Sequence, residues 1–95
     1  MAVRLVVTFT AAPGKAAELA QAMKERCAVS RKDVGCEQFE VFRSVQNPRK
    51  LVLLERWKDQ ASLDAHAKLQ GTRPPLPEGL RMSVVREDYQ HKRTR

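Results

Sequence analysis

Three side chains in the second half of the sequence could together bind and deprotonate a small organic molecule. Glu55 and Trp57 are two positions apart, so they project from one face of a β-strand. His66 follows Leu63 by three positions, which places it near the same inward stripe of a helix. An imidazole can take a proton from a phenol or quinol hydroxyl near neutral pH. A carboxylate beside it could orient the ligand or the imidazole, and the indole offers a flat wall for an aromatic ring.

Each of these residues also has a structural interpretation. Trp57 could close one end of a hydrophobic core. A single histidine on an inward helical stripe is more often a structural hydrogen-bonding group than a catalyst. Glu55 could form a cross-strand ion pair with Arg56 or Arg43. Two further residues are candidates for ligand contact on their polarity alone, namely Thr8 and Tyr89.

The elements that would carry these residues follow one another in a regular order. Alternation of apolar and polar residues predicts strands, and apolar residues repeating at three and four positions predict helices. The turn residues 46–49 predict a hairpin, and Asp59 is placed to cap the second helix. We expect strands over 3–10, 36–45, 51–57 and 81–89, helices over 15–31 and 60–69, and a loop over 71–79.

This order of elements predicts an α+β domain of ferredoxin-like βαββαβ topology, in which both helices cover one face of a four-stranded antiparallel sheet. Residues 1–90 are expected to form the domain, and residues 91–95 a basic C-terminal tail. The other face of the sheet would carry Val6, Val52, Leu54 and Phe42, which are too apolar for open water. A second copy of the chain is the expected cover, so we predict a homodimer.

Composition excludes several classes of protein. The chain has 95 residues, of which 42% are hydrophobic and 31% charged, as in a globular domain. It contains neither a long apolar run nor a signal-peptide pattern, so we expect a cytoplasmic protein with no membrane partner. The net charge of +7 is spread over loops and termini, and the central strands lack the aromatic residues that stack on RNA, so no nucleic-acid partner is expected. Cys27 and Cys36 lack a metal-binding or redox spacing and are expected to be buried or half-buried thiols.

Several segments resemble the antibiotic biosynthesis monooxygenase (ABM) domain family. The resemblance covers residues 3–69 and returns in the last strand, and its most specific part runs from Glu55 to His66. After residue 69 the chain departs from the family pattern, because a loop replaces further apolar helix and shortens one wall of the usual pocket. The segments that carry the resemblance are Pro13-Gly14-Lys15, Val34-Gly35-Cys36, Glu55-Arg56-Trp57-Lys58-Asp59 and Ala61-Ser62-Leu63-Asp64-Ala65-His66.

The resemblance implies a dimeric α+β barrel with a ligand cavity in each subunit. Monooxygenase members of the family oxidise polycyclic aromatic or quinol substrates with oxygen, without a metal or flavin. It therefore implies a cofactor-independent monooxygenase acting on a small quinol-like or polyketide-like aromatic. His66 and Glu55 would be the catalytic residues, and three residues would contact the substrate: Trp57, Thr8 and Tyr89. A non-catalytic small-molecule-binding or stress-related dimeric barrel protein is the alternative.

No metal, flavin or haem is expected as a cofactor. The haem-degrading branch of the family uses an asparagine on the first strand and a ligating histidine late in the second helix. This sequence has Val7 near the first position and the loop over 71–79 in the second region, while His91 lies outside the pattern. Neither a cluster of metal ligands nor a phosphate-binding glycine loop is present in the sequence.

Overall fold

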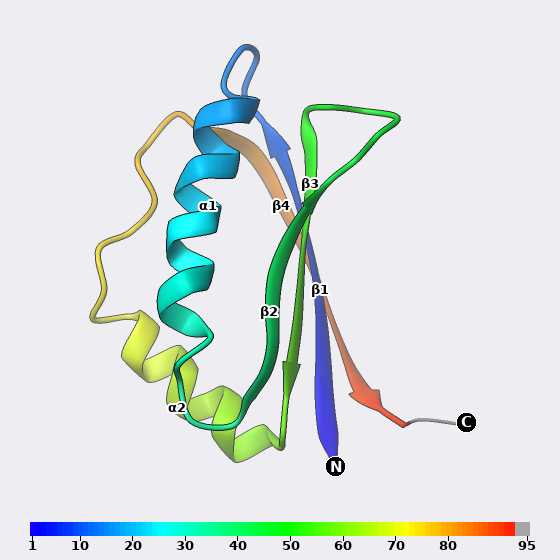
Figure 1. Ribbon diagram of the computed structural model, residues 1–95, viewed down its shortest axis with the longest axis vertical. Coiled ribbons are helices and arrows are strands. Elements are labelled where there is room, and N and C mark those ends of the chain that lie inside the picture. The colour runs from blue at the N-terminus through cyan, green and yellow to red at the C-terminus, as the bar shows by residue number, and fades with distance from the viewer. Residues whose placement is uncertain (93–95) are drawn as a thin grey trace.

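The computed structural model describes residues 1–92 and confirms the predicted α+β fold (Figure 1). The strand order in the sheet is β2-β3-β1-β4, and all neighbouring strands are antiparallel. Both helices lie on one face of this sheet in Figure 1. The elements are β1 (Ala2–Ala11), α1 (Ala16–Ser30), β2 (Cys36–Arg43), β3 (Lys50–Trp57), α2 (Gln60–Gln70) and β4 (Arg81–His91).

The two central strands bury the side chains that point toward the helices. Along β1 and β3 the odd-numbered residues are buried and the even-numbered ones are partly exposed, because successive side chains of a strand alternate between faces. α1 contributes an inward stripe that repeats at three and four residues, as predicted. The buried residues of this stripe are Ala16, Leu19, Met23, Cys27 and Ser30.

α2 begins where the sequence predicts it to begin. The Asp59 side chain accepts a hydrogen bond from the backbone N–H of Ser62 at 2.8 Å, which satisfies one of the free donors of the first turn. The buried residues of this helix are Leu63 and His66. The cap therefore fixes the point from which the helix carries His66 back over the sheet.

Two strand ends differ from the prediction. β2 ends at Arg43 rather than at Val45, because the Ser44 hydroxyl accepts hydrogen bonds from the backbone of Gln46 and Asn47 and starts the turn early. Val45 is consequently 99% exposed. β4 continues to His91, which pairs with Ala2 of β1, so the predicted tail begins inside a strand. Residues 93–95 of that tail lie outside the described residues.

The face of the sheet that points away from the helices is uncovered within the described chain. Val6, Val52 and Leu54 lie there and are each partly exposed. Phe42 of β2 is 46% exposed, and at the other edge Val85 and Tyr89 of β4 are about half exposed. We call these six residues the open face. Its apolar character agrees with the pattern from which a second copy of the chain was predicted.

The turn between α1 and β2 depends on Gly35. This residue has φ +82°, a backbone conformation that side chains disfavour, and a Cβ at its position would collide with the Ser62 side chain. Its carbonyl accepts a hydrogen bond from the Lys58 N–H at 2.8 Å. Gly35 thus allows the start of β2 to pass directly against the first turn of α2.

Gly35→Ala should lower the free energy of unfolding by about 3 kcal/mol, because backbone strain and the clash with Ser62 add together. Gly14→Ala is the matched control, since Gly14 has a similar φ of +74° but nothing within 4 Å of the added Cβ. The control should lose only about 1 kcal/mol. Urea denaturation of both variants measures the difference. Equal losses in the free energy of unfolding would mean that the clash between the new Cβ and Ser62 does not destabilise the protein.

Candidate functional site

A cavity of about 550 Å³ lies between the sheet and α2. Two titratable residues on its wall come from the segment that the sequence analysis singled out, Glu55 on β3 and His66 on α2. Three arginines from separate elements also line it: Arg26 of α1, Arg73 after α2 and Arg86 of β4. Leu5, Leu63, Ala67 and Pro75 supply apolar surface. The volume is within the range of small-molecule binding sites.

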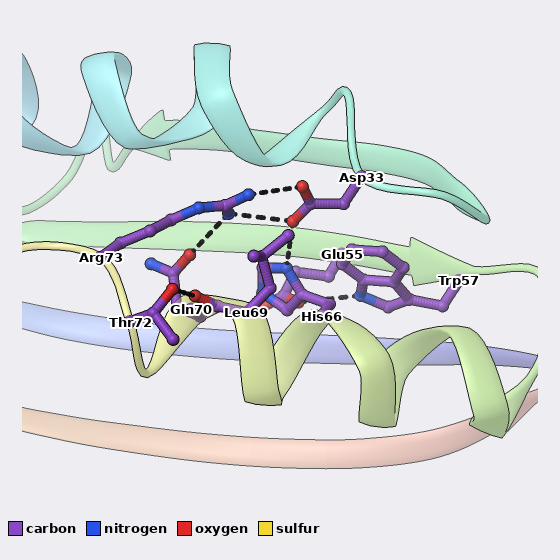
Figure 2. A network of polar contacts seen from close by, with 8 residues as sticks. All are labelled: Asp33, Glu55, Trp57, His66, Leu69, Gln70, Thr72 and Arg73. Atoms are coloured by element: carbon purple, nitrogen blue, oxygen red, sulfur yellow. Dashed lines mark hydrogen bonds and ion pairs between the residues drawn. The ribbon is translucent and has the colours of Figure 1, made fainter.

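His66 is held in one orientation by a carboxylate and two aromatic rings; Figure 2 shows the carboxylate of Asp33 and the ring of Trp57. Its Nδ1 lies 2.7 Å from Oδ2 of Asp33, in the turn after α1. The Trp57 ring lies 4.5 Å away between centroids and the Phe39 ring 5.5 Å away. Because a carboxylate faces Nδ1, a neutral imidazole carries its proton on that nitrogen and keeps a free lone pair on Nε2. The ring can therefore act as a base at Nε2.

Asp33 is bound at the same time by Arg73. The guanidinium donates two hydrogen bonds to the carboxylate, at 2.6 Å and 2.9 Å, and one to the Gln70 side chain (Figure 2). The pair with Arg73, and to a smaller extent the hydrogen bond with His66, lowers the pKa of Asp33 below its ordinary value. Asp33 is thus a buried carboxylate that stays ionised, and an ionised aspartate stabilises a protonated histidine beside it.

Glu55 lies in a different environment. It is 6% exposed, and one of its oxygens accepts a hydrogen bond at 2.9 Å from Nε1 of Trp57. Burial raises the pKa of Glu55 above its ordinary value, and the hydrogen bond from Trp57 offsets part of that effect. The predicted ion pair with Arg56 or Arg43 is wrong. Arg56 points to the opposite face of the sheet, and Arg43 donates to the Pro48 carbonyl at 2.8 Å.

The structure brings together some of the predicted site residues and separates others. Glu55 and His66 line one cavity, and Trp57 is fully buried behind them, where it contacts both without reaching the cavity wall. Thr8 and Tyr89 point to the opposite face of the sheet. Thr8 is an even-numbered residue of β1, and these residues face away from the helices. Tyr89 is paired with Arg4, another even-numbered residue of β1, and so faces the same way. These two residues therefore do not meet Glu55 and His66 at one cavity within the chain.

The sequence analysis missed four charged residues of the site. Asp33 lies in the turn after the predicted helix over 15–31, and its partners His66 and Arg73 are 33 and 40 positions away along the chain. Arg26 and Arg86 belong to elements that could be predicted, but the side of the cavity that each faces depends on tertiary packing. A single arginine within a predicted helix or strand is too frequent in sequences to single out either residue.

Other predictions concern the two cysteines, metal binding and membrane-spanning segments. Both cysteines are free, with Cys27 buried and Cys36 half-buried, as predicted. Within residues 1–92 there is no group of three or more histidine, cysteine or acidic side chains placed to hold a metal ion. No helix in the same part of the chain is both long and apolar enough to cross a membrane.

Comparison with known proteins gives the family to which this chain belongs. The sequence matches the family Antibiotic biosynthesis monooxygenase (ABM) over residues 2–73. The chain therefore belongs to the ABM family, as the resemblance of its Glu55–His66 segment indicated. A comparison of the sequence with curated proteins finds no match.

Solved structures share the fold of this chain. A conserved protein from Methanosarcina mazei Go1 is 30% identical, with a TM-score of 0.82 over 97% of this chain and 94% of that chain. PA3566 from Pseudomonas aeruginosa is 27% identical, with a TM-score of 0.82 over 97% of this chain and 95% of that one. A Deinococcus radiodurans protein provisionally named an antibiotic biosynthesis monooxygenase is 18% identical, with a TM-score of 0.77 over 97% and 94% of the two chains, and shows the fold alone.

The buried Glu55 should make stability depend on pH. A carboxyl whose folded pKa is raised contributes most stability below its ordinary value of 4.5, and that contribution is lost as pH rises through the folded pKa. Glu55→Gln keeps an acceptor for Trp57 and cannot ionise. Between pH ~4.5 and pH ~7.5 the variant should therefore gain in free energy of unfolding relative to the unmodified protein.

Urea denaturation at the two pH values measures this difference. Glu78→Gln, in the exposed loop before β4, is the matched control and should follow the unmodified protein at both. A Glu55→Gln variant with the same pH dependence as the unmodified protein would contradict the raised pKa.

Proposed function

We propose that the protein is a cytoplasmic, cofactor-independent monooxygenase that oxidises a small quinol-like or polyketide-like aromatic. Membership of the ABM family supports this general type of activity. The observation that carries the proposal is that His66 and Glu55 line the same cavity, each fixed by a buried partner. An acid–base pair in a partly apolar cavity is what oxidation without a metal or flavin requires, because the substrate itself must become electron-rich enough to react with oxygen.

In the proposed reaction His66 is the general base. Its Nε2 accepts the proton of a substrate hydroxyl or of an acidic carbon, and the ionised Asp33 stabilises the imidazolium that forms. The substrate anion transfers electrons to O₂ and forms a carbon–oxygen bond, which after protonation by His66 gives a hydroperoxide. Loss of water from the hydroperoxide leaves a carbonyl group. One oxygen atom thus enters the product and the other leaves as water.

Glu55 has a complementary role in this proposal. Because burial raises its pKa, the carboxyl keeps its proton at a higher pH than an exposed glutamate. A protonated Glu55 donates a hydrogen bond to the substrate oxygen on which negative charge develops. Trp57 holds this carboxyl by its Nε1 and also supports the His66 ring, so its role is to position both residues from behind the cavity wall.

His66→Ala should lower turnover by ~10²-fold or more, because it removes the general base. His91→Ala is the matched control, since His91 is the other histidine of the chain and lies on β4 away from the cavity. Oxygen uptake with a panel of reduced naphthoquinones and anthrones measures turnover. Unchanged uptake in His66→Ala would contradict the assignment of the base.

The same panel separates the proposed enzyme from a binding protein. Ligands should first raise the unfolding temperature of the unmodified protein, because binding to the folded state stabilises it. Compounds that bind without any oxygen uptake would favour the non-catalytic small-molecule-binding or stress-related protein over the enzyme. A panel that neither binds nor reacts would contradict an aromatic ligand altogether.

We also propose that the protein is a homodimer assembled through the open face. Two such sheets packed together would bury their apolar residues and exceed ~1,000 Å² of total interface. In that arrangement Val85 and Tyr89, which both lie on the open face of β4, contribute to the interface. Thr8, which pairs with Val85, would lie against the same interface.

Leu54→Glu should convert the dimer to a monomer, because it places a charge in the middle of the open face. Val45→Glu is the matched control, since Val45 is 99% exposed in the loop between β2 and β3. Light scattering at micromolar concentration should give about twice the chain mass for the unmodified protein and the control. A monomeric unmodified protein would contradict the proposed assembly.

A further inference from the structure

The three arginines of the cavity differ in their partners. Arg73 donates two hydrogen bonds to Asp33, and Arg86 donates two to Asp88, both at 2.7 Å. Arg26 has no acidic partner within residues 1–92. Its guanidinium makes one hydrogen bond among these residues, at 3.3 Å to the Pro74 carbonyl. Glu25 lines the same groove and Glu55 the same cavity, but neither forms an ion pair with Arg26, so its charge lacks a direct acidic partner in the described chain.

The surroundings of Arg26 make an unbalanced charge costly. Burial lowers the pKa of its guanidinium, and the positive charges of Arg81 and Arg73 lower it further. A cation that is partly removed from water and close to other cations favours any anion that can reach it. The nearest acidic residue along α1, Glu25, is exposed and accepts a hydrogen bond from Gln21 rather than from Arg26.

Arg26 also occupies a particular place in the fold. A groove of about 380 Å³ runs between α1 and the proline-rich loop that follows α2, and Figure 1 shows this loop passing along α1. Arg26 lines both the groove and the cavity that contains His66 and Glu55. The other residues common to both are Gln70, Arg73 and Pro75. The guanidinium thus lies at the boundary between the two spaces.

A polar group without a hydrogen-bond partner lies on the same side of α1 as Arg26. Ser30 is one turn beyond Arg26, lines the groove and has no exposed surface. Its hydroxyl is buried and has no hydrogen-bond partner among the described residues. Buried polar groups are normally hydrogen-bonded, so an unpaired hydroxyl one helical turn after Arg26, which itself makes a single hydrogen bond, is consistent with a bound polar group in the groove.

We propose that the ligand is an aromatic carboxylate, with its ring in the cavity beside His66 and Glu55 and its carboxylate bound by Arg26 at the boundary with the groove. This inference rests on the proposed function, because it takes the cavity to hold the aromatic ring. One unbalanced guanidinium matches one negative charge, which favours a carboxylate over a dianionic phosphate. The proline and leucine side chains of the groove can cover the apolar part of a carboxylate-bearing arm.

Isothermal titration calorimetry of the unmodified full chain with 2-naphthoate, 2-naphthamide and 2-naphthyl phosphate tests the proposal. The unmodified protein should bind the carboxylate at least ~10-fold more tightly than the uncharged amide of the same shape. Arg26→Met should weaken binding of 2-naphthoate by ~10-fold and leave that of 2-naphthamide within about twofold. Lys24→Met, which removes the same charge from an exposed position of α1, is the matched control and should change neither.

Four results would overturn the inference. Equal affinity for the acid and the amide, with Arg26→Met altering neither, removes the carboxylate and leaves the aromatic cavity of the proposed function intact. An equal loss for both ligands in Arg26→Met means that Arg26 supports the loop through Pro74 and does not bind the anion. Tighter binding of 2-naphthyl phosphate than of 2-naphthoate would make the ligand an aromatic phosphate and not a carboxylate. If none of the three ligands binds, the aromatic cavity of the proposed function is contradicted as well.

Discussion

The candidate site depends on one buried carboxylate. Asp33 is held between the His66 imidazole and the Arg73 guanidinium, and only 8% of its side-chain surface is exposed. A buried charge is costly unless it is paired and hydrogen-bonded, so both partners are needed where they are. Asp33 thereby joins three segments that are far apart along the chain: the turn after α1, the helix α2 and the loop that follows it. Loss of either partner would leave a carboxylate with little solvent contact and only one partner to offset its desolvation cost.

The position of Asp33 follows in turn from the backbone of the α1–β2 connection. Its N–H donates to the Ser30 carbonyl at 3.1 Å, and its carbonyl accepts from Cys36 at the start of β2, also at 3.1 Å. Because Gly35 has no side chain, this turn can pack closely against Ser62 at the beginning of α2. The fold and the site are therefore coupled, because the contact that docks α2 against the turn also brings the Asp33 carboxylate to His66.

Local sequence patterns are sufficient to predict the helices and strands and part of the candidate site. Alternation along β3 predicts that Glu55 and Trp57 share a face, and the Asp59 cap predicts where α2 begins. Local patterns were not sufficient for Asp33 and Arg73, because their pairing depends on how the turn and the loop meet in space. Thr8 and Tyr89 were chosen for their polarity alone, and the register of β1 and β4 places both on the other face of the sheet.

The cavity is lined by residues inside the family match and by residues beyond it. The family match covers residues 2–73 and so includes Glu55 and His66, whereas it ends where the proline-rich loop begins. Pro74, Pro75 and Pro77 restrict the backbone of that loop, which lowers the entropy lost when it is held along α1. The loop engages Arg73 with Asp33 and leaves Arg26 without an acidic partner in the described chain. A loop beyond the family match thus forms one side of the groove next to Arg26, whereas Arg26, Glu55 and His66 all belong to the family-matched region.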